Sequence, residues 1–365
     1  MSQTNIPGKT RPHLESLPRE ILQSIFLHSL EVNLPRASAH LSRALSNQLL
    51  YTWLIRLAFS STNPGSREDF FTSDFLPPPL DFWSLSWEDR QQLQTALLTC
   101  RWCTLPLIRK CQREYVHHAI RRKCGDLAFA PEDRELLHRL DSRFENLAEC
   151  DNAAEGRRGK GDLVIPAQLQ QKRHSTNDPN QNQTDRTPSE PTQPPEETTH
   201  PDHKLSIWLQ IGAIQIRPQN EIYLENNLYR LPSSQILKPG RIPNKLLRRP
   251  WSDAQFEFLT LLAQDFYLDE DEHEAERSAL ITTRLIRKRR IEPFKRLLRM
   301  YFRSANCRVP ARWPLLPEHF EAIMRFGVGN GDPFAGVVLE ERWGDIPVEV
   351  KEDLVRYFGR YEEFL

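Results

Sequence analysis

The sequence predicts a mainly α-helical protein that carries one small antiparallel β element. Three observations support this fold class. Apolar residues recur at helical spacing in most segments, the 365 residues include 28 prolines but only 14 glycines, and strand-like alternation is found in a short stretch that begins near residue 205. Many prolines with few glycines are typical of helices broken by proline-containing loops, rather than of a glycine-rich α/β enzyme.

The length and the net charge of the chain limit the classes of protein to which it can belong. A chain of 365 residues is long enough for two to three domains. Lys plus Arg and Asp plus Glu both number 49, so the net charge of zero indicates no overall attraction to nucleic acid or to an anionic membrane. No apolar run approaches the roughly 18 residues of a membrane span, and we expect no membrane partner.

The N-terminal residues and the cysteines indicate a compartment. Residues 1–13 contain neither an apolar signal-peptide core nor a cleavage site, and we expect them to form a disordered tail. The six cysteines are thinly spread along the chain. We therefore expect reduced thiols in an intracellular protein that is cytoplasmic, nuclear or both.

The clearest boundary along the chain is a polar segment at residues 151–203. From Ser175 to His203 there is no aliphatic, aromatic or glycine residue. Such a segment has nothing to bury, so ordering it would cost backbone entropy without a return. We predict a disordered linker at 151–203, between an N-terminal module at 14–150 and a C-terminal domain at 204–365.

The N-terminal module is predicted to be helical. Ser16 is the expected N-cap of the opening helix, with Pro18 in its first turn. A loop with three consecutive prolines follows a helix at 46–59, and Ser86 is the expected N-cap of the next helix. Further helices are predicted at 86 to about 103 and from about 104 to 123.

The C-terminal domain is predicted to begin with strands and to continue as helices. Leu205, Ile207, Leu209 and Ile211 alternate, and Asn226-Asn227 gives a weak hairpin signal, so we expect two or three antiparallel strands within 204–232. Residues 250–365 are predicted to be helical. There Phe256, Phe294 and Phe334 lie 38 and 40 residues apart in similar segments. The spacing indicates either degenerate helical repeats or an irregular helical domain.

The opening helix is apolar on too many sides for an ordinary surface helix. One apolar stripe contains Leu17, Ile21 and Ile25, and a second lies about 140° around the helix, with Leu27 pointing in a third direction. The second stripe contains Leu22, Phe26 and Leu30. This pattern fits either a central core helix or a helix held between its own small bundle and a partner protein.

Residues 14–60 resemble the F-box. The resemblance is carried by LPREILQSIF, NLPRASAHLSRALS and LLYTWLIRLAF. Leu45 stands where the family often has tryptophan, Tyr51 and Trp53 replace a Leu-Trp pair, and two extra residues occur near 31–33. Together with the later IPNKLLRRPW, these segments resemble the sequences of F-box proteins from filamentous fungi. Residues 61–150 would then be a helical extension of the F-box-like module.

The resemblance implies a docking function without catalysis and without a cofactor. F-boxes bind the Skp-type adaptor of cullin–RING ubiquitin ligases, so this chain would be a substrate receptor that recruits an unknown protein through its C-terminal regions. Leu22, Phe26, Leu49 and Trp53 are expected to hold the three helices together. Candidates for the adaptor surface or its immediate support are Leu17, Pro18, Ile21, Leu34, Pro35, Leu41 and Leu45.

Two other constellations leave alternatives open. Cys100 and Cys103 form a CxxC half-site for zinc, but no second half follows at a familiar spacing, which favours thiols packed on two helices. Residues 284–303 hold nine Lys or Arg against one acid. Within them Arg287, Lys288, Arg289 and Arg290 resemble an import signal or a phosphate-binding patch.

The basic segment therefore allows two interpretations. It is either a solvated face balanced by the acidic run at 265–276, or the binding patch of a nuclear nucleic-acid-associated protein, which is the alternative function. The glycine-rich residues 327–333 are predicted to be a loop between helices, because neither a preceding strand nor a following GKS or GKT accompanies them. The sequence contains no recognisable catalytic constellation.

Overall fold

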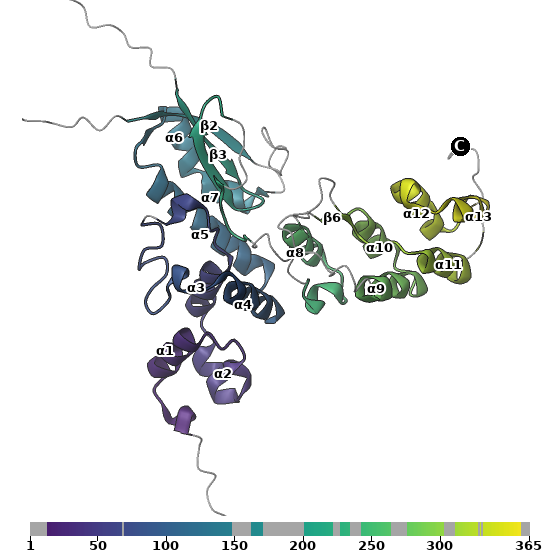
Figure 1. The fold of residues 1–365 in the computed structure, drawn as a ribbon, viewed down its shortest axis with the longest axis horizontal. Coiled ribbons are helices and arrows are strands. Elements are labelled where there is room, and N and C mark those ends of the chain that lie inside the picture. Colours follow the sequence, from purple (N-terminus) through teal and green to yellow (C-terminus); the bar gives the residue numbers. More distant parts are fainter. Residues whose placement is uncertain are drawn as a thin grey trace, which may run out of the picture. The chain divides into compact units, whose positions relative to one another are not determined.

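The computed structural model describes residues 13–67, 69–147, 162–170, 201–221, 227–233, 242–263, 276–302, 311–327, 329 and 331–358 (Figure 1). These residues form helices and a small antiparallel sheet, which confirms the predicted fold class. They fall into two compact units. The first comprises the described parts of 1–61, 71–111 and 231–365, and the second those of 62–70 and 112–230. Each unit draws on both sides of the predicted linker, so the units do not follow the predicted boundary.

The first unit begins with three helices in the range that resembles the F-box. Ser38 Oγ accepts a hydrogen bond from Leu41 N at 3.2 Å and caps the second helix, and Asn47 caps the third. Ser16 is not the N-cap that we predicted: it lies in a 3-10 turn, and Pro18 occupies the N-cap position. The elements are η1 (His13–Ser16), α1 (Arg19–Ser29), η2 (Leu34–Arg36), α2 (Ala39–Leu45) and α3 (Gln48–Phe59).

Two helices follow with the predicted starts. Ser86 Oγ accepts from Asp89 N at 3.1 Å, so Ser86 is the N-cap of α4 (Trp87–Thr99), as predicted. This helix ends four residues earlier than expected, and α5 (Leu105–Lys123) begins after a corner. The shorter elements of this region are η3 (Pro64–Ser66), η4 (Phe82–Ser84), α6 (Pro131–His138) and α7 (Leu140–Glu145).

A half-buried lysine completes the corner between α4 and α5. Lys245 Nζ donates to the carbonyl oxygens of Cys100 and Cys103, each at 2.5 Å. Both oxygens belong to the corner between the two helices, where carbonyl groups lack helical partners, and the lysine cation supplies a donor for them. Desolvation by burial lowers the pKa of Lys245. Lys245 lies in η7 (Asn244–Leu247), far along the chain from the corner that it stabilises.

The sheet belongs to the second unit, and all of its described strand pairs are antiparallel. Its order is β1-β2-β3-β4-β5. Ile165, Leu205 and Ile216 lie opposite one another on neighbouring strands and share one apolar face. The strands are β1 (Leu127–Ala128), β2 (Leu163–Leu169), β3 (His203–Trp208), β4 (Ala213–Pro218) and β5 (Tyr229–Arg230).

The β3–β4 connection is tighter than the alternating pattern predicted. Residues 209–212 form a turn in which Gly212 N donates to Leu209 O at 3.2 Å, with φ of 59° at Gly212. Leu209 and Ile211 therefore lie in the turn instead of continuing the strand. Glycine adopts this left-handed conformation at little cost, which explains its place here.

The predicted disordered linker is wrong for the residues that form β2. Strand β2 lies wholly within 151–203, and Ile165 is buried opposite Leu205. The short apolar run Leu163–Ile165 was too brief to stand out within a long polar segment. Pro166 has no N–H, and it suits a strand whose only described neighbour besides β3 is the two-residue β1. The remainder of the predicted linker, the tail up to residue 12 and Asn226 lie outside the described residues.

The C-terminal residues of the first unit form helices, as predicted for 250–365. Helix α9 contacts α11, and helix α10 contacts α12. The pair of α9 and α10 therefore lies beside the pair of α11 and α12 (Figure 1). Phe256, Phe294 and Phe334 are all buried, and the rings of the last two are 5.0 Å apart. The elements are α8 (Asp253–Ala263), α9 (Glu276–Arg287), α10 (Ile291–Leu298), β6 (Tyr301–Phe302), β7 (Ala311–Arg312), α11 (Pro317–Phe326), α12 (Pro333–Arg342), η8 (Trp343–Asp345) and α13 (Val348–Phe358).

Helices α9 and α11 run in the same direction. His319 in the first turn of α11 contacts Ala279 near the start of α9, and Arg289, just after α9, donates to the carbonyl oxygen of Phe326 at the end of α11. His319 Nδ1 accepts from Leu316 N at 2.8 Å, so Nε2 carries the proton and donates to Ala279 O at 3.1 Å. Desolvation by burial lowers the pKa of His319 below its ordinary value of 6.5.

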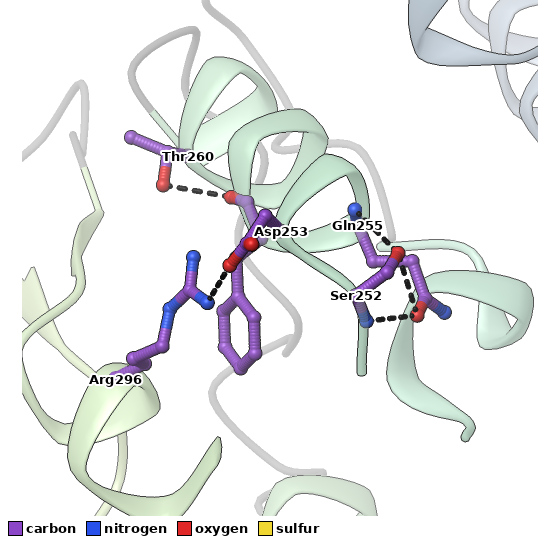
Figure 2. A network of polar contacts seen from close by, with 6 residues as sticks. Ser252, Asp253, Gln255, Thr260 and Arg296 are labelled. Atoms are coloured by element: carbon purple, nitrogen blue, oxygen red, sulfur yellow. Dashed lines mark hydrogen bonds and ion pairs between the residues drawn. The ribbon is translucent and has the colours of Figure 1, made fainter. Parts of the chain in front are cut away.

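Polar contacts fix the N-terminal end of α8. Ser252 and Gln255 form a capping box, in which Gln255 N donates to Ser252 Oγ at 3.3 Å and Ser252 N donates to Gln255 Oε1 at 2.8 Å (Figure 2). Asp253 pairs with Arg296 of α10 at 2.5 Å, and the guanidinium carbon of Arg296 lies 4.0 Å from the centroid of the Phe256 ring. These contacts connect α8 to α10.

The glycine-rich segment 327–333 connects α11 to α12, which confirms the predicted loop for its described residues. Gly331 has φ of 79° and donates its N–H to Phe358 O at 2.7 Å. A Cβ on Gly327 would lie 2.7 Å from the backbone carbonyl oxygen of Ile323, so a glycine suits this close approach. Asp332 Oδ1 accepts from Phe334 N at 2.9 Å and caps α12.

Candidate docking surface

The two predicted apolar stripes of the opening helix differ in exposure, although Ile25 of the first and Leu30 of the second are both half-buried. Leu22 and Phe26 are fully buried, whereas Ile21 is 47% exposed. Pro18 is exposed, and Leu17 is half-buried. The stripe of Leu17 and Ile21 therefore faces outward, and the stripe of Leu22 and Phe26 faces the core. We call Leu17, Pro18 and Ile21 the α1 stripe.

Polar contacts to α2 hold α1 in this orientation. Arg19 Nε and Gln23 Nε2 donate to the same carbonyl oxygen, that of Ala44, at 3.1 and 3.2 Å. Ala44 lies at the C-terminal end of α2, where carbonyl groups lack helical partners. At about 100° per residue, Ile21 lies about 160° around α1 from Arg19, on the far side from this contact. The contact thus fixes which side of α1 is turned outward.

The predicted adaptor-contact residues that follow α1 lie partly near the surface and partly in the core. Leu34 and Pro35 lie in η2 and are half-buried. Leu41 and Leu45 are buried in α2, so they are not surface residues but support the fold beneath it. Leu45, where the F-box family often has tryptophan, is completely buried. It therefore lies in the core of the module.

One residue that we expected in the core lies at the surface. Leu49 is 55% exposed, and Trp53 is half-buried, so Leu49 does not hold the helices together as predicted. Leu49 follows the capping Asn47 in the first turn of α3, whereas Leu50 and Leu54 make the buried face. Leu49 is thus an exposed apolar residue of the F-box-like range that our sequence reasoning missed. The signal that could have found it is its place two residues after the N-cap.

The basic candidate residues do not act as one patch. Arg289 Nη2 pairs with the fully buried carboxylate of Asp332 at 2.8 Å, and its guanidinium carbon lies 4.6 Å from the centroid of the Phe334 ring. Arg287, Lys288 and Arg290 are exposed. Arg289 thus stabilises the junction between the α9–α10 turn and α12, which leaves the other three cations at the surface.

The structure describes some of the counter-charges of the basic segment. We expected the acidic run at 265–276 to balance it, but residues 264–275 lie outside the described residues. The described acids that pair with the segment belong to other helices. They are Asp253 with Arg296, Asp332 with Arg289, and Glu341 with Arg299.

The CxxC cysteines have the character of packed thiols. Cys100 and Cys103 are both buried, and burial raises the pKa of Cys103 to about 12. A thiol must lose its proton to bind zinc, and this environment opposes that loss. Within the described ranges, no group of three or more His, Cys, Asp and Glu side chains could hold a metal ion.

Comparisons with protein-family models, with curated proteins and with solved structures found no match to this chain. In the part of the chain that the structure describes, no helix combines the length and the apolar character that crossing a membrane requires.

Proposed function

We propose that residues 14–60 dock onto the Skp-type adaptor of a cullin–RING ubiquitin ligase, and that the rest of the chain recruits a protein substrate. The observation that supports this proposal is the outward α1 stripe, with Ile21 47% exposed. Leu17, Pro18 and Ile21 lie in or just before α1, and the F-box resemblance implies adaptor contact at these three positions. In this proposal the chain has no active site, and the assembly supplies the ubiquitin-transfer chemistry.

The energy available from the stripe is adequate for docking. Burying one large aliphatic side chain stabilises a complex by roughly 1.5–3 kcal/mol. A few such anchors can dominate an interface after the costs of association are met. The buried stripe and the contacts of Arg19 and Gln23 with Ala44 hold the anchors in place before a partner arrives. Less ordering is then required on binding.

Co-purification of the full chain with a recombinant Skp-type adaptor tests the proposal. We expect Ile21→Asp to abolish co-purification, because a carboxylate would be buried in the interface without a partner. Ile21 is exposed in the free chain, so the variant should unfold at the same temperature as the parent protein.

The matched control is Val348→Asp. Val348 is 74% exposed at the start of α13, outside the F-box-like range, so the same chemical change there should leave co-purification intact. Retention of the adaptor by Ile21→Asp, or equal loss in both variants, would show that the α1 stripe is not the docking surface.

A further inference from the structure

The outward face of α9 combines one apolar residue with several cations. Leu280, Arg284, Arg287 and Lys288 are spaced by four, seven and eight residues, which places them on one side of the helix and its last turn. The opposite side is buried, with Ile286 at its centre. Leu280 is 65% exposed, and the three cations are exposed. Folding of α9 therefore leaves this face uncovered.

The cations of this region fall into two groups. Arg289, Arg296 and Arg299 each pair with an acid of a neighbouring helix. By contrast, the second group makes no ion pair with any residue that the structure describes. Its members are Arg284, Arg287, Lys288 and Arg290. Positive charge is thus neutralised where the helices meet and left unneutralised on the outward side.

Helix α11 adds to this second group. Because α9 and α11 run in the same direction, the C-terminal end of α11 lies beside that of α9. The guanidinium carbons of Arg287 and Arg325 lie 5.5 and 5.6 Å from the centroid of the Phe326 ring. We call the combined cations the cationic end. It consists of Arg284, Arg287, Lys288, Arg290 and Arg325.

The helix dipoles do not account for so much charge. The C-terminal end of a helix carries about half a negative elementary charge, so two such ends call for about one cation. The cationic end holds five. A surface that concentrates this charge beside an exposed leucine is suited to a ligand that is both acidic and partly apolar.

We infer that the cationic end and Leu280 bind an acidic segment of a partner protein. Guanidinium groups match carboxylates in geometry and hold them by paired hydrogen bonds, and Leu280 offers a contact for an apolar side chain of the same segment. In a ubiquitin-ligase receptor this segment would belong to the substrate, and that last step alone rests on the proposed function.

A protein segment fits this surface better than a nucleic acid does. Single-stranded nucleic acids bind on aromatic rings that stack with bases, and here the Phe326 ring already has two arginines close to it. The exposed Leu280 has no matching group on a phosphate backbone. The zero net charge of the whole chain also provides no general attraction to nucleic acid.

Fluorescence anisotropy with the full chain tests this inference. The probe is a short fluorescein-labelled peptide of Asp and Glu with one central Leu. We expect saturable binding that becomes about tenfold weaker in Arg284→Glu plus Lys288→Glu, because two attractive charge pairs become repulsive. Leu280→Ser should weaken binding of this peptide and leave unchanged the binding of a peptide with Ser in place of its Leu.

The matched control is Arg101→Glu plus Arg248→Glu, which changes two exposed cations elsewhere and alters the net charge equally. It should bind the peptide like the parent chain. Equal loss in the control, no binding by the parent chain, or tighter binding of an oligonucleotide of equal charge would overturn the inference. Binding only after the acids of 265–276 are replaced would also overturn it, since the occupant would then be the chain's own segment.

The same measurement separates this inference from the proposed function. The Ile21→Asp chain should bind the peptide as the parent chain does, because α1 takes no part in the cationic end. Peptide binding together with failure to bind the adaptor would refute the proposed function alone. Adaptor binding without peptide binding would refute the present inference alone.

Discussion

Helices α1 and α9 bury one face each but differ in what they leave outside. The buried faces are chemically alike, with Phe26 in α1 and Ile286 in α9 among residues that are almost wholly covered. The outward faces differ, since α1 presents the apolar Ile21 and α9 presents cations around Leu280. Folding restricts the residue types on the inward face of a helix. The outward face is not restricted in this way, so its residue types can indicate which kind of partner binds there.

Truncating the inward faces should have the largest effect. Phe26→Ala should lower the free energy of unfolding by about 3–5 kcal/mol and Ile286→Ala by about 2–5 kcal/mol, because each leaves a cavity in a covered site. Urea unfolding followed by circular dichroism measures both. A loss below about 1 kcal/mol in either variant would mean that this face is not packed as described.

Acid should weaken the packing of α11 against α9. Neutral His319 uses both ring nitrogens in hydrogen bonds, and burial lowers its pKa in the folded state. The stabilisation by neutral His319 is fully present above the unfolded pKa of about 6.5 and is lost as pH falls from there towards the lowered folded pKa.

Urea midpoints measured between pH 7.5 and pH 5 check this expectation, since the range spans the ordinary histidine pKa of about 6.5. The loss of stability on acidification should be smaller in His319→Gln than in the parent chain. The same loss in both would show that another group is responsible.

Truncating the outward faces should have the smallest effect on stability. Ile21→Ala and Leu280→Ala remove exposed side chains, so each should change the free energy of unfolding by no more than about 0.5 kcal/mol. The same urea experiment measures them. A loss approaching that of Phe26→Ala would show that the outward side chain is packed against the protein, and the contrast between the two faces would disappear.

Local patterns predicted the helices well because their signals lie within a few residues. Ser86 marks the start of α4 through its own hydroxyl group, and α5 begins close to the expected restart near Thr104. The apolar spacing on α1 also identified both stripes, and burial then decided which of them faces outward. A helix depends mainly on its neighbours in sequence, which explains this success.

Features that depend on distant partners could not be predicted in this way. Strand β2 is a strand because Ile165 pairs opposite Leu205, across a long polar segment. Arg289 does not contribute to a surface patch because it forms an ion pair with the buried Asp332, which caps α12. Leu41 and Leu45 could belong to a surface or a core on sequence grounds alone, and only the position of α2 places them inside.

The lysine at the corner between α4 and α5 has a consequence for chemical labelling. Lys245 gives hydrogen bonds to two carbonyl oxygens in a desolvated site, so its amine is shielded from reagents that acylate exposed lysines. Lys245 is therefore a natural reporter, whose modification in a labelling experiment would signal that this corner has opened.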